Sequence, residues 1–171
     1  MDFDNETYDF YRRGLFMRIT TRGRYALRAS LALAKLGTAN KPVSISCLSE
    51  RENISSVFLE QIFFKLRKAG IVSSIRGPGG GFWFAQPLEE LTAKQILDAA
   101  GEELELTFCD KRYDDCDRVG ECMSHHVWVD INHMVRRYFD GITIASILEK
   151  HGHTGSAVSA VTTGLEAEKY E

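Results

Sequence analysis

Three cysteines and a histidine within one short stretch are the residues of this chain best suited to bind a metal. Cys109, Cys116, Cys122 and His125 lie in the sequence CDKRYDDCDRVGECMSHH, whose acidic and basic neighbours are typical of an exposed loop. Thiolates and imidazole nitrogens are preferred ligands of zinc, copper(I) and iron–sulphur clusters. The stretch is therefore a candidate metal centre, and we expect the protein to sense a signal there.

The spacing of the four residues bears on the kind of metal. Six residues separate the first cysteine from the second, five separate the second from the third, and two separate the third from the histidine. Zinc knuckles favour ligand pairs roughly two to four residues apart, so the spacing mildly disfavours zinc. His126 and His133 are alternative ligands, but His125 continues the run at the nearest spacing. Zinc, an iron–sulphur cluster and unliganded reduced cysteines all remain open on these residues alone.

The remaining cysteine, Cys47, has different neighbours. It lies on the apolar side of a short helical pattern, where a free cysteine behaves as a small hydrophobe, and we predict that it belongs to the core. Four cysteines distributed in this way do not match the disulfide framework of a small secreted protein. Residues 1–16 carry four acidic side chains and no apolar run, unlike a secretory signal. We therefore expect a cytoplasmic, reduced protein without a membrane segment.

Charge is divided unequally along the chain. The net charge is −3, yet residues 17–87 carry eleven Lys and Arg against three Asp and Glu, whereas residues 88–171 carry eight against seventeen. A chain of 171 residues, 44% of them hydrophobic, can bury one good core but hardly two large domains. Charged helices are often only solvated faces, but a basic first half is also typical of a module that binds a polyanion.

The apolar pattern of the first half predicts a winged helix. Helices are expected over 20–36, with Thr20 or Thr21 as the N-cap, over 45–52, and over 56–69. The sequences IVSSIR and FWF then flank GPGGG at 77–81, which predicts two short strands around a tight glycine turn. A helix, a helix-turn-helix and a two-stranded wing, all basic, predict a mainly α winged helix-turn-helix DNA-binding domain over 17–87 with a small β-wing.

The second half is expected to join a linker helix, the cysteine loop and a long helix over 88–150. Thr92 and Gln95 form a capping box for the linker helix, which ends at Gly101. The cysteine loop, about 108–123, precedes a helix to Asp140. Apolar residues recur in that helix at the spacing of a helix that packs along a partner, which predicts a dimerisation helix: Trp128, Ile131, Val135 and Tyr138. Thr143 caps one last short helix, and a disordered tail is expected over 151–171.

The predicted helix-turn-helix supplies candidate DNA contacts of two kinds. Basic residues would neutralise phosphates whatever the base sequence: Arg18, Arg22, Arg24, Arg28, Lys65, Arg67 and Lys68. The start of the second helix reaches base edges in the major groove, where Gln suits adenine, Glu accepts from cytosine, and Phe packs on a thymine methyl. That segment offers Ser55, Ser56, Phe58, Glu60 and Gln61. Arg76, beside the glycine turn, suits a narrow minor groove, and we assign Gly77 and Gly80 to the same surface.

Three stretches of the chain resemble one family of regulators. MRITTRGRYAL at 17–27, ISSVFLEQIFFKLRKAGIVSSIRGPGGGF at 54–82, and the Cys-x-x-His-x-x-Trp run ending at Trp128 are similar to the Rrf2 family of winged-helix transcription factors, and within it to the IscR-like iron–sulphur regulators. The resemblance extends from Met17 to about Lys150. It implies that Met17 is the natural start and that residues 1–16 are an extension.

The resemblance also implies roles for individual residues. The three cysteines and His125 match the ligands of a 2Fe–2S cluster, and Glu60 matches an acid that discriminates between classes of target when the cluster state changes. Gln61 and Arg76 match DNA-reading positions, and Ser55 matches a phosphate contact. Relatives that sense nitric oxide or iron bind a 4Fe–4S cluster through similar cysteines, without the His-x-x-Trp continuation.

These features predict a homodimeric, cluster-sensing DNA-binding regulator that is not an enzyme. Its expected partners are an operator in double-stranded DNA, a second copy of the chain, and the iron–sulphur assembly machinery as cluster donor. One alternative is a nitric-oxide or iron sensor with a 4Fe–4S cluster, and another is a zinc-stabilised DNA-binding protein without a sensing role. A redox or metal-transfer enzyme is disfavoured, because the chain shows no general base or substrate-binding motif.

Overall fold

The computed structural model describes residues 19–38, 41–107, 109, 116 and 118–151. Within these ranges the chain forms six helices and one two-stranded antiparallel sheet, so the predicted mainly α winged helix is confirmed. Arg18, the proposed extension and the proposed tail after residue 151 lie outside the described residues. In the described part of the chain, no helix combines the length and the apolar character needed to cross a membrane.

Three helices form the helix-turn-helix unit: α2 (Thr21–Leu36), α3 (Ile45–Glu52) and α4 (Ser56–Lys68). Local capping signals define their ends. The Thr20 hydroxyl accepts from the N–H of Arg22 at 3.1 Å, as expected of an N-cap. The Ser44 hydroxyl caps α3, which ends at Asn53 in the left-handed conformation with φ of 51°. Two helices joined by so short a turn must cross steeply.

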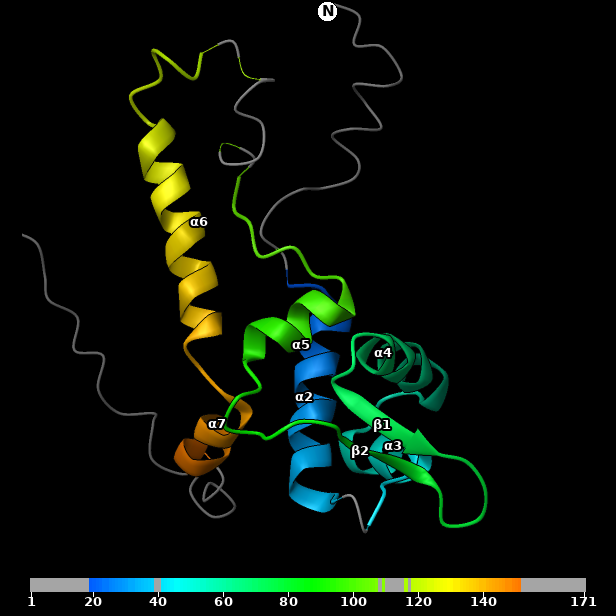
Figure 1. The fold of residues 1–171 in the computed structure, drawn as a ribbon. Coiled ribbons are helices and arrows are strands. Elements are labelled where there is room, and N and C mark those ends of the chain that lie inside the picture. The colour runs from blue at the N-terminus through cyan, green and yellow to red at the C-terminus, as the bar shows by residue number, and fades with distance from the viewer. Residues whose placement is uncertain (1–18, 39–40, 108, 110–115, 117, 152–171) are drawn as a thin grey trace, which may run out of the picture.

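The wing consists of β1 (Val72–Ile75), β2 (Gly81–Phe84) and the turn between them. Val72 pairs with Phe84 and Ile75 with Gly81 in antiparallel register. Gly77 has a φ of 108°, which a side-chain-bearing residue rarely adopts, so the turn requires glycine there. The wing thus projects beyond the edge of the helical unit (Figure 1).

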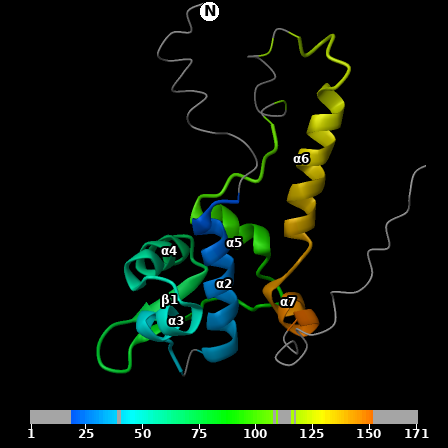
Figure 2. The same cartoon turned by 180° about the vertical axis from the view of Figure 1, so that it is seen from behind.

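The later helices return to the same core. They are α5 (Ala93–Ala100), α6 (His125–Asp140) and α7 (Ile144–His151), and the predicted capping box of Thr92 and Gln95 opens α5. Ile144 of α7 is fully buried, and its N–H donates to the Leu91 carbonyl at 2.8 Å. Figures 1 and 2 show α6 extending away from this packed unit as an arm, while α7 lies beside α2.

One cluster of buried residues holds the helix-turn-helix, wing, α5 and α7 together. Helix α4 contributes four buried side chains on one stripe, as its pattern predicts: Leu59, Ile62, Phe63 and Leu66. The prediction that Cys47 belongs to this core is wrong, because its side chain is exposed. Helix α3 is only eight residues long and fully buries Leu48 alone, so Cys47 faces a surface depression beside Lys41 and the wing turn.

Candidate DNA-binding surface and cysteine loop

The exposed face of α4 carries most of the predicted base-reading residues. Ser55, Ser56, Glu60 and Gln61 are all exposed, and Ser55 makes no side-chain capping bond that would occupy its hydroxyl. Phe58 is only half exposed, because its ring packs edge-on against Tyr25 with centroids 5.8 Å apart. Helix α4 therefore presents polar groups to the solvent along its first two turns.

Two of the predicted phosphate-binding residues bind the carboxyl ends of helices within the chain. The Lys65 ammonium donates to the carbonyl of Ala100, the last residue of α5, at 3.0 Å. Arg28 donates to the Glu52 carbonyl at the end of α3 at 2.7 Å and lies over the Tyr25 ring. Both side chains neutralise the negative end of a helix. The remaining basic side chains that are exposed to a polyanion include Arg22 and Lys68. Arg24 and Arg67 are exposed as well, and they donate to the hydroxyls of Thr21 at 3.2 Å and Ser74 at 3.4 Å.

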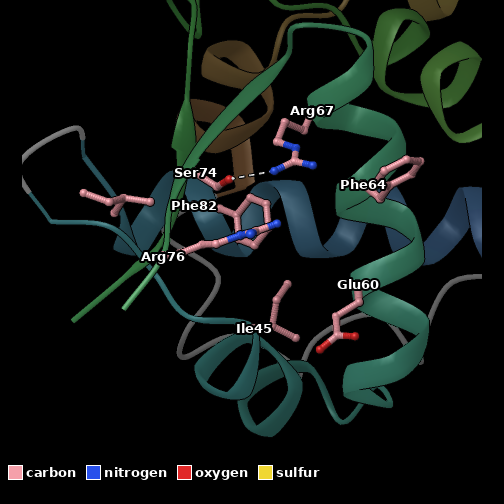
Figure 3. Close-up of a pocket in the computed structure, with 8 residues that line it drawn as sticks. Ile45, Glu60, Phe64, Arg67, Ser74, Arg76 and Phe82 are labelled. Atoms are coloured by element: carbon pink, nitrogen blue, oxygen red, sulfur yellow. Dashed lines mark hydrogen bonds between the residues drawn. The ribbon is translucent and has the colours of Figure 1, made fainter. Parts of the chain in front are cut away.

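The Arg76 side chain extends from the wing toward α4 (Figure 3). Arg76 is exposed and lines a cleft between the two elements together with Glu60 and Arg67. Gly80 also has a steric reason to be glycine, because an added Cβ would collide with the Ile75 carbonyl oxygen. The turn glycines thus shape the wing and keep its backbone free of side chains.

Four residues were predicted as metal ligands, and two of them lie together at the start of α6. His125 is the first residue of the helix and is buried, and its N–H donates to the Cys122 carbonyl at 3.1 Å. Cys109 is half-buried and Cys116 is exposed, and all three cysteines are free thiols. Among the described residues, no three His, Cys, Asp or Glu side chains are grouped so that they could hold a metal.

Cys122 lies in a setting that favours its thiolate. The Ser124 hydroxyl lies 3.3 Å from its sulphur, and hydrogen bonds from the side chain and backbone of Ser124 lower the pKa of the thiol below its ordinary value. Arg118 contributes a smaller effect in the same direction. A thiolate is the form that binds metals, so the direction of this shift is compatible with the predicted ligand role.

The segment 101–107, which we call the strap, connects α5 to Cys109 and is fixed at both ends. At its start, the Glu102 carboxylate accepts from the N–H of Thr20 at 2.9 Å and from the Thr20 hydroxyl, so it binds the start of α2. Farther along, Glu105 forms an ion pair with Arg136 of α6. Glu102 and Glu105 are both buried, so these contacts hold the strap in place.

The last two residues of the strap are bound by one side chain of α6. Asn132 is fully buried, and its amide oxygen accepts from the N–H of Leu106 at 2.7 Å. Its amide nitrogen donates to the carbonyl of Thr107 at 3.0 Å. Contacts with α6 therefore fix the position of the strap up to Thr107, two residues before Cys109. His125 is the first residue of the same helix.

The rest of α6 exposes a stripe of large apolar side chains. Five of them are between 38% and 64% exposed: Val127, Trp128, Ile131, Met134 and Tyr138. By contrast, the two buried residues of the helix are the polar His125 and Asn132. A contiguous apolar stripe on a protruding helix is typical of a protein–protein interface.

These features define a winged-helix DNA-binding protein: a helix-turn-helix with an exposed polar recognition face, a basic first half, and a wing with a glycine turn. Residues 19–150 match the Rrf2 family, described as iron-dependent transcriptional regulators, and the chain belongs to this family. It is 41% identical to an HTH-type transcriptional regulator of Neisseria meningitidis serogroup A over 85% of this chain and 98% of the relative.

The chain is also similar to two regulators, IscR and CymR. The chain is 36% identical to the HTH-type transcriptional regulator IscR of Aliivibrio salmonicida, over 77% of both chains. The solved structure of CymR, the global cysteine regulator of B. subtilis, is similar with a TM-score of 0.66 and 27% identity, over 79% of this chain and 98% of that one. Transcription regulation and DNA binding are therefore family properties of this chain.

Phe64 of the recognition helix and Asn132 of α6 were not predicted from the sequence. Phe64 is 59% exposed and lies on the face of α4 that carries Glu60 and Gln61, one turn farther along. Its spacing of four and three residues from those two could have identified it. Asn132 has no comparable signal, since its partners in the strap are 25 and 26 residues distant in sequence.

Proposed function

We propose that this protein is a homodimeric transcription regulator whose DNA binding responds to an iron–sulphur cluster. Cys109, Cys116, Cys122 and His125 would hold the cluster, with 2Fe–2S favoured over 4Fe–4S by the His-x-x-Trp continuation. The observation that carries the proposal is that the segments on both sides of the cysteine loop are attached to α6. Asn132 binds the end of the strap, directly before the loop, and the His125 main-chain N–H donates to the Cys122 carbonyl after it.

The donor set suits such a group. Three free thiols and an imidazole are a ligand set that iron–sulphur clusters use, and a cluster with thiolate ligands carries negative charge. The start of α6 carries the partial positive charge of a helix N-terminus, which favours an anionic group beside His125. When bound, the cluster would supply one-electron redox chemistry and tie the four ligands together.

The strap offers a physical route from the loop to the DNA-binding unit. It is bound to α6 near Cys109, while Glu102 binds the start of α2 and Lys65 of α4 binds the end of α5. A change in the order of the loop would therefore be passed through the strap and α5 to the contact between Lys65 of the recognition helix and Ala100. The resemblance to IscR-like regulators suggests that Glu60 decides which operators tolerate the change.

The apolar stripe of α6 supports the homodimer. A second copy is the natural partner, because a stripe repeated every three and four residues packs along an equivalent helix. Two recognition helices in one dimer would bind two half-sites of double-stranded DNA. The iron–sulphur assembly machinery would be a further, transient partner as cluster donor, in the cytoplasm.

Anaerobic purification followed by visible absorption spectroscopy and iron and sulfide analysis tests the cluster. We expect a coloured protein that contains equal amounts of iron and sulfide. The amount of iron per protein chain then distinguishes a 2Fe–2S from a 4Fe–4S cluster. Cys116→Ala should lose the colour and the iron while remaining dimeric. Cys47→Ala is the matched control, because Cys47 is an exposed cysteine outside the loop, and it should keep both.

Two other outcomes would replace this proposal. A colourless protein with stoichiometric zinc that unfolds on chelation would identify the zinc-stabilised DNA-binding alternative. A colourless, metal-free protein that still binds DNA would mean that the signal is not a cluster. The structural similarity to a cysteine regulator gives that second outcome a specific precedent within the fold.

A further inference from the structure

A cleft of about 460 Å³ separates the recognition helix from the wing. Figure 3 shows it between α4 and the β-hairpin, with Phe82 at its floor and Ile45 of α3 at one end. Its walls come from elements that the predicted DNA contacts also use. The predicted contacts place α4 in the major groove of DNA and the wing in the minor groove. They assign no ligand to the cleft between α4 and the wing.

Two guanidinium groups reach the cleft from opposite walls. Arg67 of α4 donates to the Ser74 hydroxyl at 3.4 Å, near the upper limit for a hydrogen bond, and lies 5.9 Å from the centroid of the Phe64 ring. Arg76 extends from the end of β1 toward α4 (Figure 3). Glu60, the one acid among the lining residues, lies at the end beside Ile45. The end near the two arginines therefore favours an anion.

One large apolar side chain borders the same opening. Phe64 is 59% exposed and lines the cleft from α4. The core does not require it, since it lies on the solvent side of α4. An exposed apolar group beside paired cations matches a ligand in which apolar and anionic parts alternate. The deoxyribose and phosphate of a DNA strand alternate in this way.

We propose that the cleft binds the sugar–phosphate backbone of one operator strand, with a phosphate between Arg67 and Arg76 and a deoxyribose against Phe64. The proposal rests on the DNA binding described above. If α4 enters the major groove and the wing reaches the minor groove, the strand that divides the two grooves must pass between α4 and the wing. Phe64 is then a positioning contact that fixes the register of the protein on DNA.

Binding measured against salt concentration tests this placement, with a duplex that the wild-type protein has selected from a random-sequence pool. Phe64→Lys should strengthen binding at low salt and steepen the slope of log K against log salt by about 0.9, because the new ammonium would meet a phosphate. Ala85→Lys is the matched control, since Ala85 is exposed directly after β2 and does not line the cleft, and its slope should stay that of the wild type.

Phe64→Ala tests the apolar part of the contact. We expect about fivefold weaker binding at every salt concentration, an unchanged slope and an unchanged selected sequence, because a partly buried aromatic contact to sugar is lost. Circular dichroism should show wild-type folding, since the side chain is exposed.

Three results would overturn the inference. Wild-type affinity of Phe64→Ala would remove Phe64 from the interface, and equal slopes for Phe64→Lys and Ala85→Lys would place the cleft away from phosphate. A changed preference at one base pair in the sequence selected by Phe64→Ala would place the ring on a base edge instead. If the wild-type protein selects no duplex, the proposed DNA-binding function fails together with this inference.

Discussion

The amide oxygen of Asn132 accepts a hydrogen bond of 2.7 Å from the main-chain N–H of Leu106. Asn132 is fully buried in a helix whose large apolar side chains are exposed, the reverse of the usual arrangement. Its amide nitrogen donates to the Thr107 carbonyl in addition. One side chain therefore holds two consecutive backbone groups directly before the cysteine loop.

Replacing Asn132 with Ala should destabilise the protein by about 1–3 kcal/mol, because the Leu106 N–H and the Thr107 carbonyl lose their partner. Urea denaturation measures the change. Asp130→Ala is the control on the same helix, since Asp130 is exposed, and it should change stability by less than about 0.5 kcal/mol. Equal stability of the two variants would show that Asn132 does not hold the strap.

A glycine in the first turn of α2 gives a prediction with an unusual sign. Gly→Ala within a helix normally stabilises by roughly 0.5–1 kcal/mol. At Gly23, however, an added Cβ would approach the Cγ of Glu102 to 2.5 Å. Because Glu102 is buried and bonded to Thr20, its displacement should make Gly23→Ala destabilising, by about 1 kcal/mol in thermal or urea unfolding.

A double-mutant cycle isolates the cause. With Glu102→Ala as background, Gly23→Ala should become neutral or stabilising, because the obstructing side chain is gone. If Gly23→Ala stabilises the otherwise wild-type protein, then the carboxylate of Glu102 is free to move and does not fix the start of α2.

Two neighbouring lysines of α4 should behave differently. Lys65→Ala removes the hydrogen bond to the Ala100 carbonyl and should cost about 1 kcal/mol of stability without changing the salt dependence of DNA binding. Lys68→Ala should leave stability unchanged and lower the salt slope by about one, because exposed Lys68 is available to a phosphate. An equal loss of slope in both variants would mean that Lys65 leaves Ala100 when DNA binds.

A charge in the apolar stripe of α6 should dissociate the dimer. Ile131→Glu would bury an unpaired carboxylate in the proposed interface, so sedimentation or size-exclusion chromatography should show a monomer at micromolar concentration. Arg137→Glu is the control, because Arg137 is exposed outside the stripe, and it should remain dimeric. A dimer that survives Ile131→Glu would require a different interface.

Local signals explain why the helices and the wing could be predicted from the sequence. Thr20 and Thr92 cap their helices through hydrogen bonds to residues no more than three positions away, and Gly77 adopts a conformation suited to glycine. These interactions depend on neighbouring residues alone. Apolar spacing also identified the buried stripe of α4, since a long helix samples its periodicity several times.

The rest of the site depends on contacts between distant residues. A pattern over the eight residues of α3 could not show that Cys47 faces solvent, because so short a helix has little periodicity. Similarly, Lys65 reads as a phosphate-binding residue by type and position, whereas its partner Ala100 lies 35 residues away. The face of a helix can be predicted from sequence, but the group packed against that face cannot.

We propose that the cysteine loop controls DNA binding. To test this coupling, the dissociation constants of the cluster-loaded and the cluster-free protein are measured anaerobically, at one salt concentration, for one duplex that the loaded form has selected. We predict that the two constants differ by at least about tenfold, a typical coupling between two sites. Equal constants for two folded, dimeric forms would mean that the cysteine loop is uncoupled from α4 and that it does not regulate DNA binding.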